Sequence, residues 1–211
     1  MRVTNVKFSV SPPLKLSRGL LLLRTFLGWL YVGIPHGICL GLLGIGMFFC
    51  VFIAFWAILF TGRYPKSFFD FVVDVLDWQF RVGVYGNFLR DEYPPFGLGV
   101  NYPAKFSVTY PDRLSRGLLL LKLLFGWLYV GIPHGFCLVL RGIVHGIITF
   151  IAWWAVLFTG RISEKMFRFM SGTFRWQAGV MAYLYLLTDE YPAFTGRDES
   201  QAPGQTLSVG V

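Results

Sequence analysis

Two long apolar stretches constrain the fold more than any other feature of this sequence. Between residues 20 and 60 the only charged side chain is Arg24, and between residues 118 and 158 the only ones are Lys122 and Arg141. As one straight helix, each 41-residue stretch would be about 62 Å long. The hydrocarbon core of a bilayer is only about 30 Å thick. Each stretch is therefore too long for a single straight crossing of the bilayer.

The composition agrees with a membrane protein. Of the 211 residues, 55% are hydrophobic and 14% are charged, whereas charged residues make up about 25% of a soluble domain. A chain of this size has too little polar surface to cover a soluble fold. The same numbers exclude intrinsic disorder, and three cysteines exclude a disulfide scaffold. We therefore predict an all-α integral membrane protein.

The chain is a tandem duplication. The run RGLLLLRTFLGWLYVGIPHG at 18–37 returns at 116–135 as RGLLLLKLLFGWLYVGIPHG, and the same offset aligns both copies of FTGR and of DEYP. An ungapped match of this length defines two repeats, residues 1–98 and 99–196. The remaining 197–211 form a polar tail without periodicity, which we predict to be disordered.

Each apolar stretch contains a proline that predicts a bend. Pro35 and Pro133 lie in identical Ile-Pro-His-Gly sequences, where proline removes a backbone donor and glycine permits a reversal. We predict that each stretch is a transmembrane helical hairpin, with spans at 19–34 and 37–60, and at 117–132 and 135–158. A competing interpretation keeps the first arm in the membrane interface, so that only the second arm spans.

Shorter elements flank the predicted hairpins. The sequence KFSV occurs at 7–10 and at 105–108 with strand-like alternation, so these leads are candidates to pair as a β-ribbon. After each FTGR, residues 67–90 and 165–188 read as amphipathic helices. We expect these helices on the cytoplasmic side.

The first amphipathic helix carries one charged stripe, composed of Asp70, Asp74, Asp77 and Arg81. In one interpretation the stripe faces water or headgroups, with Asp77 and Arg81 paired at i,i+4. In the other, the two helices pack about a pseudo-two-fold axis and pair charges at equivalent positions. The predicted inter-repeat pairs are Asp70 with Arg168 and Asp77 with Arg175.

Basic residues predict the topology. Lys and Arg flank the ends of both apolar stretches and are missing from the Pro-His turns, which places both termini in the cytoplasm by the positive-inside rule. No cleavable signal peptide is recognised, so a multi-pass protein of a bacterial inner membrane is expected. The predicted lipid anchors are Arg24 and Lys122, which can snorkel to headgroups, and Arg63 and Arg161, which follow interfacial tryptophans.

The Pro-His turns also raise a metal hypothesis. His36 and His134 occupy equivalent turns, and Cys39 and Cys137 follow on the same helical face, so a two-fold arrangement could form a zinc or haem site. The alternative is structural, because such a histidine can cap a helix and such a cysteine packs as a small hydrophobe. The usual enzyme motifs are not found in the sequence.

Several motifs together resemble a known family. The run NYPAKFSVTYPDRLSRG at 101–117, with IPHG, LFTGRYP and DEYPPF, is similar to bacterial membrane proteins that carry domain of unknown function 4389. The resemblance covers both repeats and implies bacterial membrane residence with no established chemistry. The second copy departs from the pattern, with Ile162-Ser163 in place of Tyr64-Pro65 and Ala193 in place of Pro95.

These observations predict a non-catalytic accessory or scaffold subunit of a membrane protein complex. Its expected partners are membrane lipids and other integral membrane proteins or further copies of itself, with no nucleic acid and no cofactor. One alternative is a small-molecule or lipid carrier with a site between the repeats. The other is a haem- or metal-binding protein that uses the two Pro-His turns.

Overall fold

The computed structural model describes residues 5–196, and each repeat has the same order of elements. Strand β1 (Val6–Val10) is followed by α1 (Arg18–Gly28), a π-helical turn η1 (Trp29–Gly33), α2 (Ile34–Thr61) and α3 (Lys66–Gly86). The second repeat gives β2 (Ala104–Val108), α4 (Arg116–Gly126), η2 (Trp127–Gly131), α5 (Ile132–Thr159) and α6 (Glu164–Leu184). The tail predicted to be disordered, 197–211, lies outside the described residues.

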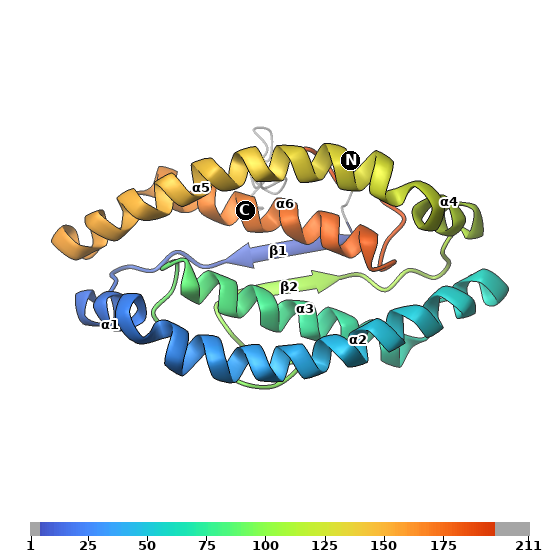
Figure 1. Ribbon diagram of the computed structural model, residues 1–211, viewed down its shortest axis with the longest axis horizontal. Coiled ribbons are helices and arrows are strands. Elements are labelled where there is room, and N and C mark those ends of the chain that lie inside the picture. Colours follow the sequence, from blue (N-terminus) through green and yellow to red (C-terminus); the bar gives the residue numbers. More distant parts are fainter. Residues whose placement is uncertain (1–4, 197–211) are drawn as a thin grey trace, which may run out of the picture.

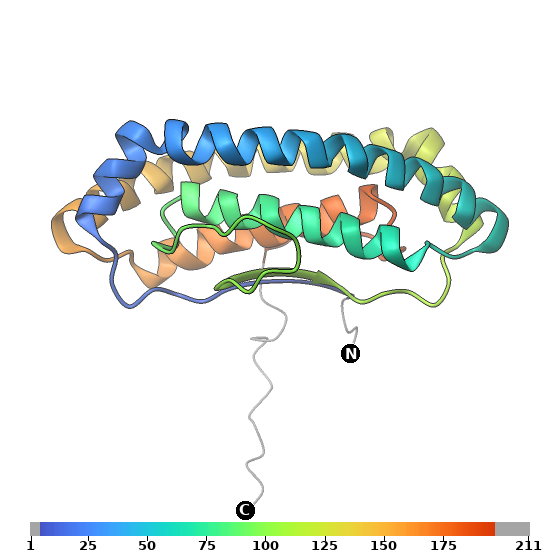
Figure 2. The same ribbon diagram turned by 90° about the horizontal axis from the view of Figure 1, so that it is seen from below.

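The elements form three layers (Figure 2). The outer layer is α1–α2 beside α4–α5, the middle layer is α3 and α6, and the ribbon β1–β2 lies beneath. The outer helices run antiparallel and bow apart at their middles, which gives the molecule a lens-shaped outline (Figure 1). In side view both outer helices arch, with their ends bent toward the ribbon side.

The predicted hairpins are wrong. Each apolar stretch is one continuous helix of 44 residues, Arg18–Thr61 and Arg116–Thr159, and each is long and apolar enough to cross a membrane. The chain bends at the proline but does not reverse, because the π-helical turn η1 continues the helix up to the proline. In this turn the Ile34 N–H bonds to the carbonyl of Trp29, five residues back. Pro35 then lies in the first turn of α2, where its fixed φ suits a helix. The two arms of either predicted hairpin are therefore one element.

The short motifs of the sequence begin and end these helices. Ser17 caps α1, its hydroxyl accepting from the N–H of Leu20, and Ser115 caps α4 in the same way. The glycine of each FTGR adopts a left-handed conformation, with φ of +73° at Gly62 and +71° at Gly160. Left-handed φ favours glycine and ends a helix, so each long helix stops at this motif.

In the ribbon, the two repeats exchange their leading strands. Strands β1 and β2 pair antiparallel, with Phe8 opposite Phe106 at the centre. The lead of the second repeat packs on α3 of the first, and the lead of the first repeat packs on α6 of the second. Phe8 lies 5.1 Å from Phe80 and 6.0 Å from Phe174 between ring centroids, so the core crosses the repeat boundary. The two repeats therefore fold as one interlocked unit.

Candidate functional site

The most prominent feature of the surface is an apolar stripe along most of the length of both outer helices. On the first helix it comprises Phe26, Leu30, Ile34, Ile38, Leu42, Ile45, Phe48, Phe52, Trp56 and Phe60, and on the second Leu124, Leu128, Ile132, Phe136, Val139, Ile143, Ile147, Phe150, Trp154 and Phe158. All are exposed, from 42% for Trp154 to 71% for Phe60. We call these two stripes the outer face. Their spacing of three or four residues places each on one side of its helix.

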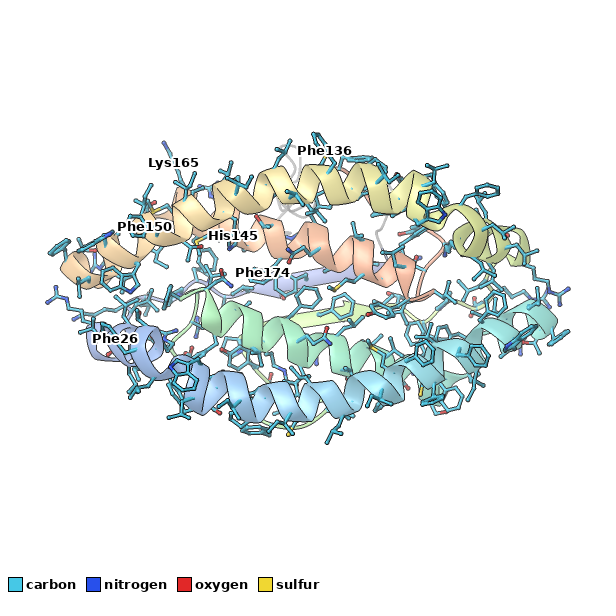
Figure 3. The ribbon with its side chains drawn as sticks, in the orientation of Figure 1. Phe26, Phe136, His145, Phe150, Lys165 and Phe174 are labelled. Carbon is cyan, nitrogen blue, oxygen red and sulfur yellow. The ribbon has the colours of Figure 1, made fainter. Side chains whose placement is uncertain are left out.

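The inner sides of the same helices meet the rest of the protein. Helix α2 packs on α3, and α5 packs on α6. In Figure 3, Phe136 lies on the outer side of its helix, whereas His145 is turned inward toward Phe174. The outer face is thus the side of the arch that the described chain leaves uncovered.

Basic side chains gather where the two outer helices meet end to end. At one end the guanidinium of Arg18 donates to the carbonyl of Phe158 at 2.6 Å, and at the other Arg116 donates to the carbonyl of Phe60 at 2.7 Å. We call these ends the feet. The first foot holds Lys15, Arg18, Arg161 and Lys165, and the second holds Arg63, Lys66, Arg113 and Arg116, all exposed. Both predicted anchors Arg63 and Arg161 therefore lie at the feet.

The other two predicted anchors do not reach outward. Arg24 is 7% exposed; it donates to the carbonyls of Tyr85 and Arg90 and forms an ion pair with Asp91. Lys122, 8% exposed, forms the equivalent pair with Asp189 at 3.0 Å and donates to the carbonyl of Thr188. The prediction that they snorkel to headgroups is wrong. A buried cation that is paired with a partly buried carboxylate is held inside rather than at the surface, and here each pair fastens the Asp-Glu-Tyr-Pro segment to the long helix.

The Pro-His turns form an aromatic cluster in each repeat. The Nδ1 of His36 accepts from the indole N–H of Trp78 at 2.9 Å, its Nε2 lies 3.1 Å from the hydroxyl of Tyr93, and its ring stacks on Phe96 at 4.0 Å. His134 repeats the pattern with Trp176 at 2.9 Å and Phe194 at 3.9 Å. We call each of these a proline–histidine cluster.

The tyrosine of each cluster compensates for the proline. In a regular α-helix the carbonyl of Tyr31 would accept from residue 35, but Pro35 has no N–H. The hydroxyl of Tyr93 donates to that carbonyl instead, at 3.0 Å. In the second repeat Tyr191 donates to the carbonyl of Tyr129 at 2.9 Å. Burial raises the pKa of both tyrosine hydroxyls, so they remain protonated donors.

These clusters do not assemble a metal site. The helix starts that carry His36 and His134 lie toward opposite ends of the molecule (Figure 1), and each histidine bonds within its own repeat. Cys39 and Cys137 are half-buried thiols, and Cys137 packs against the apolar cluster that includes Val130 and Trp176. Over residues 5–196, no three His, Cys, Asp or Glu side chains group as metal ligands. The structure thus contradicts the hypothesis that the two-fold arrangement brings the histidines together.

The predicted inter-repeat charge pairs are also wrong. Asp70 pairs with Lys66, and Arg168 pairs with Glu164 at 2.7 Å, each at i,i+4 on an exposed surface. Asp77 is 1% exposed and pairs with Arg81 at 3.3 Å. The i,i+4 pair expected in the alternative interpretation is therefore present, but it is buried rather than facing water.

Asp77 and Arg175 bind the ribbon instead of each other. The Asp77 carboxylate accepts from the N–H of Phe106 at 2.7 Å and lies 3.4 Å from the ammonium of Lys105. Arg175 donates to the carbonyls of Phe8 at 3.2 Å and Gly196 at 2.8 Å. Residues of opposite charge at one repeat position can both do this, because a strand offers both N–H donors and C=O acceptors.

Two polar residues of α5 point into the protein. Arg141 donates to the hydroxyl of Thr173 at 3.0 Å and to the carbonyl of Phe169 at 3.2 Å. The Nε2 of His145 lies 3.0 Å from the amide oxygen of Asn87, just beyond the end of α3. These side chains join α5 to the middle layer, which explains how an apolar helix tolerates them.

A cavity of about 280 Å³ lies in the first repeat, between η1 and the end of α3. Its walls are mainly apolar and include Trp29, Val82, Gly86 and Phe88, with Arg24 as the charged group. Because Trp29 is 64% exposed, the cavity adjoins the outer surface of the long helix.

Both repeats match the model of a known protein family. The model of the family described as Domain of unknown function (DUF4389) matches residues 23–97 and 121–196. This chain belongs to that family. It holds two DUF4389 copies, and each matched segment contains one proline–histidine cluster. No curated protein and no solved structure matched the chain.

Sequence reasoning missed the partners within each DUF4389 copy. A signal was nevertheless present, because Arg24 and Lys122 are the cations that recur at equivalent positions of the two apolar stretches, and the acids that recur in both repeats are those of the Asp-Glu-Tyr-Pro motifs. A charge in an apolar helix requires a partner. Searching both repeats for matched opposite charges therefore narrows the partner of each cation to the two acids of that motif.

Proposed function

We propose that this DUF4389 protein is a non-catalytic integral membrane protein that serves as an accessory or scaffold subunit. The outer face is its surface for lipids and for membrane partners. The observation that carries the proposal is the unbroken apolar stripe on both long helices, which the described chain does not cover.

The exposed apolar side chains of the outer face are energetically unfavourable in water. Burying a Leu, Ile or Phe side chain contributes about 1.5–3 kcal/mol, so roughly twenty half-exposed side chains leave on the order of 20 kcal/mol unrealised in water. This exceeds the usual net stability of a domain, about 5–15 kcal/mol. Lipid or a second membrane protein offers this burial. The basic feet suit anionic headgroups next to such a surface, and the family resemblance suggests a bacterial inner membrane.

The membrane part of the proposal is tested by extraction. Bacterial membranes that contain the protein are washed at alkaline pH, and we expect the wild type to stay in the pellet. Leu42→Asp together with Val139→Asp places two carboxylates on the outer face and should release most of the protein. The matched control is Ser9→Asp, an exposed ribbon position on the opposite side of the molecule, which should stay in the pellet. Wild-type protein in the supernatant would refute membrane residence.

The scaffold part is tested separately by purification in a mild detergent. We expect a defined complex with another membrane protein or an oligomer, identified by mass spectrometry and by its native mass. A protein that elutes alone and monomeric from membranes at natural expression levels would refute the scaffold role and leave membrane residence standing.

The cavity in the first repeat favours one second candidate, the binding of a lipid or other small amphiphile. Its apolar walls suit an acyl chain, whereas Arg24, the charged group of the lining, is already paired with Asp91. This site lies within one repeat rather than between the repeats. Gly86→Leu, which copies Leu184 at the equivalent position, should remove lipid that copurifies and is visible by native mass spectrometry.

A further inference from the structure

The arrangement of the layers constrains how the arch can lie in a bilayer; this step rests on the proposed membrane residence. Each outer helix is about 66 Å long at 1.5 Å per residue, more than twice the hydrocarbon thickness of about 30 Å. The apolar stripe nevertheless continues from Phe26 near one end to Phe60 at the other. If the long helices crossed the membrane, a large part of this stripe would stand in water.

The middle layer and the ribbon lie beneath the centre of the arch (Figure 2). A crossing orientation would therefore bring them to mid-depth. The exposed ammonium groups of Lys7 and Lys105 would then lie in hydrocarbon, together with the Asp77–Arg81 pair just above. Intramembrane charge of this kind is strongly unfavourable, by about 2.5 kcal/mol or more for each lysine.

The feet supply the complementary constraint. Each foot joins the start of one long helix to the end of the other, through Leu16 N–H to Gly160 at one end and Leu114 N–H to Gly62 at the other, both at 2.8 Å. Both feet are basic, and both bend toward the ribbon side of the outer face. Two basic ends on one side of an apolar surface match a single layer of anionic headgroups.

We propose that the protein lies along one leaflet, with the long helices roughly parallel to the membrane plane. The outer face is buried in the acyl chains of that leaflet, the feet contact its headgroups, and the ribbon faces the adjoining aqueous phase. The partner of the outer face is thus an anionic lipid monolayer. Neither long helix crosses the bilayer, and both ends of each emerge on the same side.

The test uses the number of labels on each molecule, which does not depend on the direction of insertion. Cys39, Cys50 and Cys137 are replaced by alanine, and Lys15→Cys and Ser67→Cys are introduced at exposed positions beyond the two ends of the first long helix. The protein is reconstituted into sealed vesicles of phosphatidylcholine and phosphatidylglycerol. It is treated with a membrane-impermeant maleimide and weighed intact.

We expect each molecule to carry either no label or two labels. A population that carries mostly one label would overturn the proposal, because a crossing helix exposes its ends to opposite compartments. Arg113→Cys together with Lys165→Cys tests the second long helix in the same way. This pair replaces Lys15→Cys and Ser67→Cys if the first variant does not fold. Ile45→Cys at the middle of the outer face should label only after detergent is added; labelling in intact vesicles would also count against it.

Vesicle flotation distinguishes this proposal from the one on which it rests. Protein that does not float with vesicles refutes membrane residence itself. Protein that floats and carries one label refutes only the orientation. Protein that floats with zero or two labels supports both.

Discussion

Asp77 and Arg175 occupy the same position in the two repeats, and each holds the strand contributed by the other repeat. The carboxylate accepts from the N–H of Phe106, and the guanidinium donates to the carbonyl of Phe8. Phe8 and Phe106 face each other across the ribbon. The two copies of this helix thus carry opposite charges at one position, and each fixes a strand.

Replacement of Asp77 should be strongly destabilising. Asp77→Ala removes the bond to Phe106 and leaves the buried Arg81 without its carboxylate, so we expect a loss of about 3–5 kcal/mol in the free energy of unfolding. Asp77→Asn keeps an acceptor but loses the charge, and should fall between wild type and Asp77→Ala. The measurement is a denaturant titration in detergent, followed by circular dichroism.

Asp70→Asn is the matched control, since Asp70 lies on the same helix but pairs with Lys66 on the surface. We expect a change within about 0.5 kcal/mol for this variant. Equal losses at residues 70 and 77 would show that the ribbon contact adds nothing.

The repeat offset predicted that both repeats share one order of elements, and the apolar length predicted the extent of each long stretch, but not that each stretch is one helix. The segment predicted to be an amphipathic helix at 67–90, for example, overlaps α3 at Lys66–Gly86. The course of the chain at Pro35 was predicted wrongly, because its local sequence suits a reversal as well as a bend. Whether the helix bends or reverses there depends on Tyr93, whose hydroxyl donates to a carbonyl 62 residues away in the sequence. Likewise, charge spacing alone could not show that Asp77 faces a strand rather than another helix.

Arg24 should stabilise the fold rather than anchor it to lipid. Arg24→Met leaves the carbonyls of Tyr85 and Arg90 without their donor and Asp91 without its cation, so we expect a loss of about 2–4 kcal/mol. Arg24→Lys should lose less, because Lys122 makes a similar contact to Asp189. Both variants are compared with wild type by thermal unfolding in detergent.

Arg63→Met provides the contrast, because Arg63 is an exposed residue of a foot. We expect its unfolding temperature to stay near the wild-type value and its binding to phosphatidylglycerol vesicles to weaken, more so at low salt. If Arg24→Met weakened vesicle binding without loss of stability, the buried role of Arg24 would be disproved.

Asp74 should make stability depend on pH in the direction opposite to that of a typical salt-bridged carboxylate. Burial raises its pKa above the ordinary value of 3.8, and nearby Lys105 only partly opposes this. The folded state therefore binds this proton more tightly than the unfolded state, and ionisation of Asp74 at neutral pH costs stability. As pH falls through the raised pKa this cost disappears.

Asp74→Asn should therefore raise the unfolding temperature at pH 7, and the gain should shrink as the pH approaches 4. Melting curves of wild type and variant across this range, recorded in the same detergent, measure the difference. A gain that is independent of pH would mean that something other than the charge causes it.

Pro35 and Tyr93 should be energetically coupled, although they never share a hydrogen bond. Tyr93→Phe removes the donor to the Tyr31 carbonyl and the contact to His36, so we expect a loss of about 1–3 kcal/mol. Pro35→Ala provides a backbone N–H at the position that such a carbonyl normally bonds. In that background the loss caused by Tyr93→Phe should be smaller by about 1 kcal/mol.

The second repeat provides an internal comparison for this double-mutant cycle. Tyr191 donates to the Tyr129 carbonyl, and His134 Nε2 has no hydrogen-bond partner among the described residues. Tyr191→Phe should therefore cost less than Tyr93→Phe, and Pro133→Ala should offset a larger share of that cost. Additive losses in both repeats would show that the tyrosine does not compensate for the proline. In that case the carbonyls of Tyr31 and Tyr129 would have to be satisfied by a group other than the tyrosine hydroxyl, and the bend in each long helix would need another explanation.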